Sequence, residues 1–303
     1  DSLSGYNQFM ANAGNIQNKG FEILLTGSIL TNPEKLRWNV TANISRNLNT
    51  IEELTDGIEQ YGLGGYDNLT VFAEVGKEYG AIYGRRYLRV TDESSPYYGQ
   101  KILSGTGLAQ AESGTFYLGS QVPKFLMGIN NTFAYKNFGL SFQVDGRFGG
   151  KIFSGTNHAM QANGSHVATV VDGERENFVA EGVIEKDGVY EVNTIAVTPQ
   201  SYWNSITGVN NLGINEENIY KADNIRLRTV QLNYSLPKHI FANSTFAKSA
   251  KIGLTMNNVW MIKSYANGVD PEAVYATGSN AVGFEYLNFP SSRSFIFNLS
   301  VGF

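Results

Sequence analysis

The chain has 303 residues, is rich in aromatic residues and glycine, and carries little charge. Charged residues make up 17% of the sequence, whereas about 25% is typical of soluble domains. The formal net charge is −4 without a run of Lys or Arg, which argues against a surface that binds nucleic-acid phosphates. Cysteine is absent, so disulfides, thiolate metal sites and cysteine nucleophiles are excluded.

The sequence lacks the run of about eighteen apolar residues that a transmembrane helix needs. A membrane-spanning barrel would escape this test, because lumen-facing residues dilute the hydropathy of each strand. The chain begins at Asp1 without methionine or signal peptide, which we interpret as a fragment or a processed piece.

Seven segments alternate apolar and polar residues over the length, about nine to eleven residues, that an oblique strand needs to cross a bilayer. In chain order they are 20–30, 36–46, 125–135, 138–148, 226–235, 250–260 and 293–303. In the second of them Trp38 and Val40 alternate with Asn39 and Thr41. Side chains of a strand point to opposite faces in turn, so each segment has one apolar and one polar face. The pattern predicts seven neighbouring antiparallel strands of a transmembrane β-barrel.

The last segment ends on an aromatic residue, Phe303, which shares its parity with Phe295, Phe297, Leu299 and Val301. This ending is typical of the final strand of an outer-membrane barrel. We interpret Phe303 as the C-terminal signal for barrel assembly.

The connections between the segments differ strongly in length. Residues 31–35 and 136–137 form short joints and 236–249 an intermediate one, whereas 47–124, 149–225 and 261–292 are long. Because outer-membrane barrels have short periplasmic turns and long extracellular loops, this alternation fixes the direction of every strand. Residues 81–90 also look like a strand; we place them in the first long loop, paired with 113–118 as an extracellular hairpin.

Aromatic residues of the apolar faces gather at the two ends of the predicted strands, as in membrane girdles. The periplasmic group is Trp38, Tyr135, Phe138, Tyr234 and Phe303, and the outer group is Phe125, Phe148, Trp260 and Phe295.

The sequence carries none of the common catalytic motifs, and we expect neither an enzyme nor a cofactor. His158 and His166 share one loop, but isolated loop histidines are more often solvated than metal-bound, so no metal site is predicted.

Residues suited to binding lie in the long loops and on the polar faces. Aromatic rings next to amides suit sugar rings or peptides. The candidates for substrate binding are Tyr97, Tyr98, Tyr202, Trp203, Tyr265, Asp145 and Arg147. For Asp145 and Arg147, which face the lumen, the sequence leaves open whether they form an ion pair of the wall or contact a passing solute.

Several short strings along the chain match one family as a set. They are Gly14-Asn15-Ile16-Gln17-Asn18-Lys19-Gly20-Phe21-Glu22, Trp38 with Asn43-Ile44-Ser45-Arg46-Asn47, Val75-Gly76-Lys77 before Tyr83-Gly84, Pro123-Lys124 before Tyr135-Lys136-Asn137-Phe138, Tyr220 to Leu227, and Asn257-Asn258-Val259-Trp260 with Gly268-Val269-Asp270-Pro271-Glu272. They resemble the C-terminal third of a SusC-type TonB-dependent transporter of the Bacteroidetes. The acidic loop that the family carries before Pro123 is missing, so its calcium role is not carried over.

The resemblance implies that residues 1–303 are the C-terminal portion of a 22-stranded barrel in the bacterial outer membrane, without its plug and N-terminal strands. It implies import of an oligosaccharide or peptide nutrient. The implied partners are the rest of the barrel and the plug, TonB acting through the plug, a SusD-like surface lipoprotein, membrane lipid and lipopolysaccharide, and the barrel assembly machinery.

Two other interpretations remain open at this stage. One is a structural or secretion barrel that recognises no cargo. The other is a soluble carbohydrate-binding β-sandwich, which explains the alternation and the loop tyrosines but not the bilayer-length strands.

Overall fold

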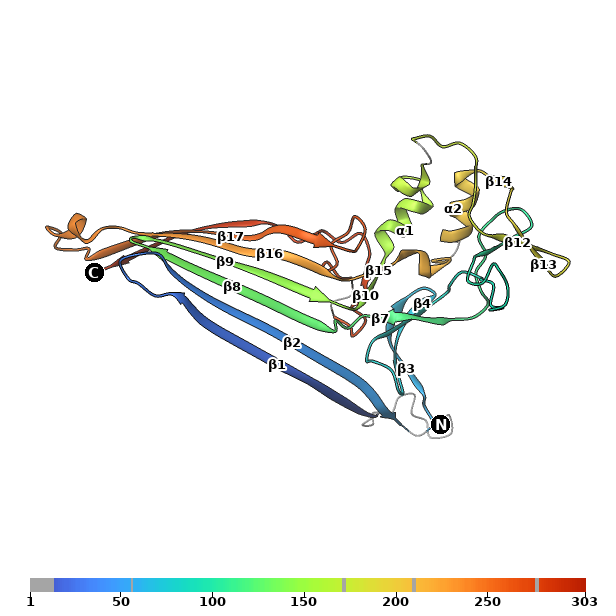
Figure 1. Cartoon of the computed structure of the whole chain (residues 1–303), viewed down its shortest axis with the longest axis horizontal. Coiled ribbons are helices and arrows are strands. Elements are labelled where there is room, and N and C mark those ends of the chain that lie inside the picture. The colour runs from blue at the N-terminus through green and yellow to red at the C-terminus, as the bar shows by residue number, and fades with distance from the viewer. Residues whose placement is uncertain (1–13, 56, 171–172, 209–210, 276–277) are drawn as a thin grey trace, which may run out of the picture.

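The computed structural model describes residues 14–303 apart from 56, 171–172, 209–210 and 276–277; the start of the chain at Asp1 lies outside these described residues. It consists of a long, curved antiparallel sheet with a folded cap at one end (Figure 1). Among the described residues no helix is long and apolar enough to cross a membrane.

All seven predicted strands are present and form one sheet. They are β1 (Gly14–Leu30), β2 (Arg37–Leu54), β8 (Phe125–Tyr135), β9 (Phe138–Phe148), β16 (Asn224–Ser235), β17 (Ser249–Ser264) and β19 (Ser294–Gly302). Their order in the sheet is their order in the chain, and every neighbouring pair is antiparallel. The prediction of seven neighbouring antiparallel strands is therefore confirmed.

The strand ends agree with the prediction to within two residues, except at the cap end of β1, β2 and β17, where β17 continues to Ser264 rather than residue 260. β8 and β9 have the predicted bounds, and the two-residue turn between them places Lys136 at φ 50°. β1 and β2 are longer than predicted, since they stay paired as far as Gly14 and Leu54. This extension carries polar residues such as Asn, Gln and Glu on both faces, so it shows no alternation that the sequence could reveal.

The pairing register keeps apolar and polar residues in separate rows across the sheet. One row of successive partners is Ala42, Ile129, Val144, Leu227 and Trp260. The adjacent row, on the other face, is Thr26, Thr41, Asn130, Gln143, Thr229, Asn257 and Ser294. We call these the outer and inner faces. Because register errors of one residue would exchange the faces, the consistent rows show that all seven strands share the same two environments.

The polar residue Asn131 lies on the outer face and is paired there. Asn131 stands opposite Val40 and Phe142, and its Oδ1 accepts a hydrogen bond of 3.0 Å from the indole Nε1 of Trp38. The indole also stacks on Phe133, with ring centroids 5.6 Å apart. The amide oxygen of Asn131 is thus satisfied within the sheet, as an apolar environment requires.

The three long loops fold into the cap. Its small sheets are β3 (Gln60–Tyr66), β4 (Leu69–Glu74), β5 (Ala81–Gly84) and β7 (Phe116–Ser120); β6 (Ile102–Leu103), β12 (Val183–Lys186) and β13 (Val189–Val192); β10 (Lys151–Ser154), β15 (Ile219–Lys221) and β18 (Phe284–Glu285); and β11 (Phe178–Val179) with β14 (Ala196–Val197). Its helices are α1 (Gly155–Ala162) and α2 (Pro199–Thr207), with short 3-10 turns η1 (Val167–Thr169) and η2 (Asn215–Asn218). The third 3-10 turn, η3 (Lys238–Phe241), lies at the opposite end of the sheet.

The predicted pairing of 81–90 with 113–118 is confirmed at its centre, where Tyr83 and Gly84 of β5 pair with Tyr117 and Phe116 of β7. Beyond Gly84 the pairing continues only as isolated bridges, such as that of Tyr87 with Ala111.

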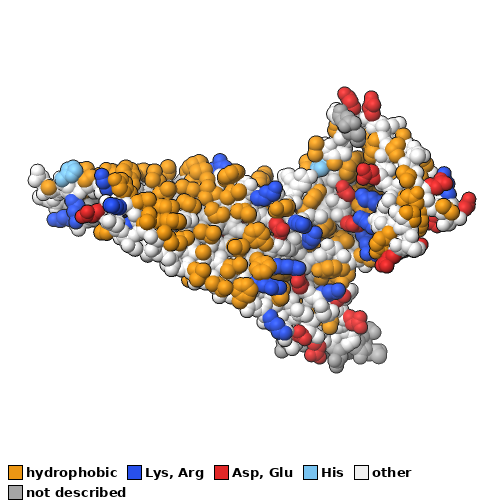
Figure 2. Space-filling view, in the orientation of Figure 1, with side chains coloured by type: hydrophobic (Ala, Val, Ile, Leu, Met, Phe, Trp, Pro, Cys, Tyr) orange, Lys and Arg blue, Asp and Glu red, His pale blue; other side chains and the backbone are white. Residues whose placement is uncertain are grey.

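The buried core lies in the cap rather than under the sheet. One cluster joins Leu69 and Ile82 of the first long loop with Phe153 of the second and Phe284 of the third. Space filling shows hydrophobic side chains spread over the face of the sheet and charged ones gathered in the cap and at the opposite tip (Figure 2). The three loops are therefore held together by a shared core, while the apolar outer face of the sheet is left uncovered by protein.

The two faces lead to a direct test in the full-length protein. Val144→Arg places a charge in the outer row and should reduce assembly into the membrane, at a cost of about 2–4 kcal/mol near the midplane of the bilayer. Gln143→Arg, its neighbour on the inner face, should be tolerated. Heat-modifiable migration of outer-membrane fractions in gel electrophoresis measures how much of each variant is folded in the membrane. Equal yields of the two variants would contradict the assigned faces.

Candidate functional site

A network of charged side chains ties the third long loop to the inner face of the sheet. Arg226 of β16 stands opposite Asp145, and its side chain is only 5% exposed. Its guanidinium donates to the carboxylate of Asp270 in the loop and, at 3.1 Å, to the hydroxyl Oγ of Ser291. A buried arginine needs such partners, because an unpaired buried charge is strongly destabilising.

A second arginine extends this network along the wall. The register between β16 and its neighbours shifts between Leu227 and Thr229, which turns Arg228 toward the same side as Arg226. Arg228 donates two hydrogen bonds of 3.0 Å to the two carboxylate oxygens of Glu272, and its Nε donates to Asp145 at 2.9 Å. Two parallel bonds to one carboxylate fix the position of Glu272 as well as its charge.

An ion pair between Asp145 and Arg147, the first of the two roles left open, does not form, and contact of either residue with a solute stays a prediction. Asp145 pairs with Arg228, not with Arg147, although both residues of β9 lie on the inner face. Arg147 donates instead to the backbone oxygen of Gln121 at 3.4 Å. The physical reason is the bulge at Arg228, which brings a third charged side chain within reach of Asp145.

The carboxylate of Asp270 is held in its charged form. Burial acts to raise the pKa of Asp270, but hydrogen bonds from Arg226, Ser291 and the backbone N–H of Glu272 outweigh it and leave the pKa lowered. Asp270 therefore stays ionised at neutral pH, and the loop remains attached to the wall. Asp270, Glu272 and Arg226 all lie in strings that match the family, but no sequence pattern connects them with each other or with Arg228.

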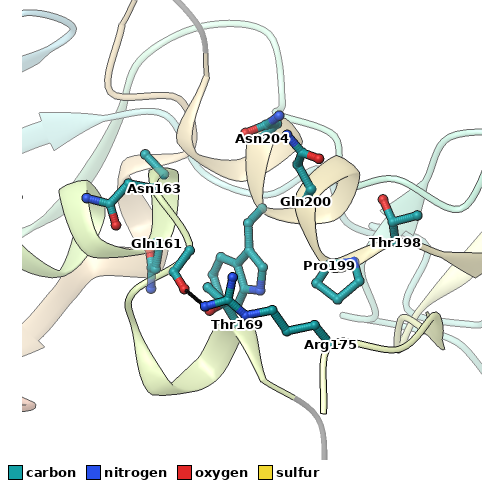
Figure 3. A pocket seen from close by; sticks show the side chains of 11 residues that line it. Gln161, Asn163, Thr169, Arg175, Thr198, Pro199, Gln200 and Asn204 are labelled. Carbon is teal, nitrogen blue, oxygen red and sulfur yellow. Dashed lines mark hydrogen bonds between the residues drawn. The ribbon is translucent and has the colours of Figure 1, made fainter.

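The cap contains a cavity of about 430 Å³ between α1 and α2 (Figure 3). Its floor is buried and its rim exposed. The residues that line it are Gln161, Ala162, Asn163, Gly164, Thr169, Arg175, Thr198, Pro199, Gln200, Trp203 and Asn204. Amides, hydroxyls, one guanidinium and one indole make this lining suited to neutral polar ligands that also offer an apolar face.

Both helices that frame the cavity have defined starts and a direct link. Ser154 caps α1 by accepting the N–H of Asn157 at 3.0 Å, and Thr198 caps α2 by accepting the N–H of Ser201 at 3.1 Å. The ring Nε2 of His158 on α1 lies 2.9 Å from the backbone oxygen of Thr207 on α2. These bonds hold the two walls of the cavity at a fixed separation.

Only two of the predicted binding aromatics come together in this cavity region. Tyr202 and Trp203 are neighbours on α2 with ring centroids 5.7 Å apart, and Trp203, 7% exposed, lines the cavity. Burial raises the pKa of Tyr202 to about 12, so its hydroxyl stays protonated. Tyr97 packs against a separate buried cluster in the cap.

The other predicted candidates stand apart from the cavity. Tyr98 and Tyr265 are exposed and do not line it. The sequence missed Arg175, whose guanidinium donates to the backbone oxygen of Gly164 at 2.7 Å and so spans from the following segment to the end of α1. No spacing rule connects an isolated loop arginine with a helix end eleven residues earlier, so only the fold reveals it.

Three of the aromatic residues predicted for the periplasmic girdle share one row of the sheet. Tyr135, Phe138 and Tyr234 are successive partners in one row, and the rings of Phe138 and Tyr234 are 4.7 Å apart. Trp260 and Phe295 are exposed on the outer face nearer the cap, and Phe303 is exposed at the far end. Their contact with lipid stays a prediction.

Both loop histidines make local hydrogen bonds. His158 contacts Thr207 as described, and Nδ1 of His166 accepts the N–H of Ala168 at 3.1 Å at the start of η1. Among the residues that the structure describes, no group of three or more His, Cys, Asp or Glu side chains could hold a metal ion.

Comparisons with known proteins agree with this geometry. No protein-family model matches the chain. TonB-dependent receptor P3 of Formosa agariphila is 26% identical over 99% of this chain and 30% of the receptor. TonB-dependent receptor SusC of Bacteroides thetaiotaomicron is 22% identical over 98% of this chain and 27% of SusC.

Solved structures give the same result for the fold. The RagAB peptide importer in its open-open state has a TM-score of 0.69 at 17% identity, over 100% of this chain and 30% of that chain. Its closed-closed state has a TM-score of 0.66. The fold is therefore that of a partial transmembrane β-barrel of the TonB-dependent receptor class, located in the bacterial outer membrane. The more particular resemblance to SusC is confirmed, and the chain spans about 30% of the length of the relatives it matches.

The buried pair of Arg226 and Asp270 should control how firmly the third loop is attached. In the full-length protein Arg226→Gln leaves the Asp270 carboxylate buried without its cation, at a cost of about 3–5 kcal/mol. Hydrogen exchange of residues 265–275 and 278–293 should become much faster. Lys186→Gln, which breaks the exposed pair with Glu191, should cost less than about 1 kcal/mol and leave that exchange unchanged. Unchanged protection in Arg226→Gln would show that the network does not hold the loop.

Because of His158 and His166, the stability of the cap should depend on pH. Burial lowers the pKa of His158 and of His166, so the folded cap binds fewer protons there than the unfolded chain. The stability of the α1–α2 contact should therefore be intact above the ordinary histidine pKa and fall as the pH drops below about 6.5. Hydrogen exchange of α1 and α2 at about pH 7.5 and about pH 5.5, corrected for intrinsic rates, should show this loss.

His158→Gln, whose amide can still donate to the Thr207 carbonyl, should reduce the pH dependence. Equal protection at both pH values in the parent protein would contradict the assignment.

Proposed function

We propose that this chain is the C-terminal portion of the barrel of a TonB-dependent outer-membrane importer for an oligosaccharide or peptide nutrient, which works with a SusD-like surface lipoprotein. The observation that carries the proposal is the separation of all seven strands into an apolar outer face and a polar inner face, with every long loop at one end. The whole-chain match to TonB-dependent receptors supports it.

The seven-stranded sheet needs further strands to close into a barrel. β1 and β19 each have a neighbour on one side only within the described residues. Unpaired strand edges are not tolerated in hydrocarbon, where every backbone N–H and C=O must be bonded. We propose that the rest of the barrel closes the sheet, that a plug fills it, and that TonB acts through that plug.

The inner face supplies a hydrated wall for cargo and plug. Its main row consists of hydroxyls and amides, several of them bonded to each other, such as Thr229 to Asn257 at 3.2 Å. Neutral groups of this kind exchange hydrogen bonds with a passing solute without holding it as firmly as ion pairs would. The charged side chains of Arg226 and Arg228 are already paired and serve to anchor the loop.

The cavity between α1 and α2 is the recognition element that we propose for cargo. Trp203 offers an indole edge in its floor, and Arg175, Asn163 and Asn204 offer donors and acceptors at its rim. Sugar hydroxyls and peptide groups both match this set. The exposed Tyr98 and Tyr265 remain candidates for contact with cargo or with the lipoprotein.

Uptake by whole cells tests this function. Cells that express the complete transporter with its lipoprotein are given labelled oligosaccharides or labelled peptides, with TonB present or deleted. One of the two cargo classes should be taken up only when TonB is present. Failure of both classes to show TonB-dependent uptake would contradict the proposal and favour a structural or secretion barrel.

The cavity is tested in the same assay. Arg175→Ala combined with Asn204→Ala removes two exposed side chains from the rim. Because Arg175 also bonds to the backbone oxygen of Gly164, hydrogen exchange of α1 and α2 is measured in the same variant to show that the cavity keeps its fold. Loss of one or two hydrogen bonds should weaken uptake of the accepted cargo by about 10-fold. Lys186→Ala, on the exposed β12–β13 hairpin, is the matched control and should leave uptake unchanged. Unaltered uptake in the double variant would remove the cavity from the recognition site.

A further inference from the structure

The turn between β16 and β17, residues 236–248, is larger than its connection requires. The neighbouring hairpin of β8 and β9 closes with two residues, Lys136 and Asn137. The 236–248 turn instead contains the 3-10 turn η3 and projects beyond the end of the sheet (Figure 1). Extra length in a connection of this kind is usually functional.

The projecting turn is ordered and exposes large apolar side chains. The hydroxyl Oγ of Ser244 accepts the N–H groups of Phe246 and Ala247, at 3.3 and 3.0 Å, and the N–H of Lys248 donates to Gly302 at 2.7 Å. On this framework Ile240 is 54% exposed and Phe246 is 72% exposed. Exposed apolar side chains of this size indicate a contact with a membrane or another protein when they are part of a larger apolar surface.

The apolar side of the turn continues the outer face of the sheet. The ring of Phe246 meets the ring of Phe303 with centroids 4.5 Å apart. Phe303 is 71% exposed and shares its parity with the outer-face residues Phe295 to Val301 of β19. Phe246 therefore lies at the end of the apolar outer face that is farthest from the cap.

The charged side chains around the turn are mostly basic. The tip of the sheet opposite the cap carries six Lys or Arg residues and one acid, Glu34, although the whole chain has a net charge of −4. The six are Lys35, Arg37, Lys136, Lys238, Lys248 and Lys251. Residues 236–251 contain no Asp or Glu, and no ion pair among the described residues involves any of the six. Lys and Arg gather at this tip in Figure 2.

We propose that the 236–248 turn is a binding site for anionic phospholipids of the periplasmic leaflet. Ile240 and Phe246 enter the boundary between acyl chains and head groups, and Lys238 and Lys248 contact the phosphates. This pairing of apolar side chains with Lys is the chemistry of interfacial membrane segments. Lipopolysaccharide lies in the opposite leaflet at the cap end, so phospholipid is the anionic lipid within reach.

Lipid retention by the purified full-length protein tests the charge. Phosphatidylglycerol is titrated into the detergent-solubilised protein and counted by native mass spectrometry, with phosphatidylcholine as the neutral probe. Lys238→Gln with Lys248→Gln should weaken phosphatidylglycerol binding by about 25-fold, since each lysine near an anionic surface is worth about fivefold. Lys186→Gln with Lys221→Gln removes the same charge from the cap and should have no effect. Equal retention in both double variants, or equal binding of the two lipids, would overturn the proposal.

A depth measurement tests the apolar half without relying on binding. In a background without other cysteines, a spin label is attached through Phe246→Cys or, as the control in the cap, Val189→Cys, and the protein is placed in nanodiscs that contain phosphatidylglycerol. The label at 246 should be more accessible to oxygen than to a water-soluble nickel reagent, and the label at 189 should show the reverse. A label at 246 that behaves like the one at 189 would show that the turn lies in water and contacts a soluble periplasmic partner instead. Neither experiment depends on cargo or uptake.

Discussion

A strand that crosses hydrocarbon must pair all its backbone groups and show the lipid only apolar side chains, and the rest of this structure depends on that constraint. It explains why the seven strands follow one another in sheet order, because adjacent pairing leaves no backbone group open between them. It also explains why the outer-face residue Asn131 is bonded to Trp38. The low overall charge of the chain follows from the same constraint, since so much of its surface faces lipid.

The cap obeys the ordinary rules of a water-soluble fold, and the two regions must be joined. Buried side chains from all three long loops make its core, so the loops form one unit. The network of Arg226 and Arg228 with Asp270 and Glu272 then attaches this unit to the wall from the lumen side. A surface ion pair would contribute little to such an attachment, whereas a buried pair is costly to break. A few buried charges therefore hold the third loop, and with it the cap core, against the inner face of the sheet.

Strands with one apolar and one polar face could be predicted from the sequence. β8 and β9 begin and end where their alternation does, and the pairing of Tyr83 with Tyr117 was also anticipated. The outer extension of β1 and β2 was missed, because outside the membrane both faces of a strand are wet and the period of two disappears. The alternation of apolar and polar residues therefore identifies only the part of a strand that faces lipid.

The site was less accessible to sequence reasoning, because it is made by contacts between distant segments. Arg228 reaches Asp145 only through a bulge, and Arg175 reaches Gly164 only through the fold of the second loop. Of the loop aromatics, Trp203 lines a cavity, whereas Tyr97 is part of a core. The aromatic composition of the loops indicates that they can bind a ligand. It does not show which rings pack in the protein core and which line a binding cavity.

The central claim is that these seven strands are adjacent strands of a barrel wall, with lipid on the outer side and water on the inner side. Electron cryomicroscopy of the full-length protein in lipid nanodiscs tests it most directly. The account predicts acyl-chain density against Val144, Leu232 and Phe297, with Gln143 and Thr229 facing a lumen. Density that instead shows the apolar row of Val144 packed against a second sheet, away from lipid, would contradict it.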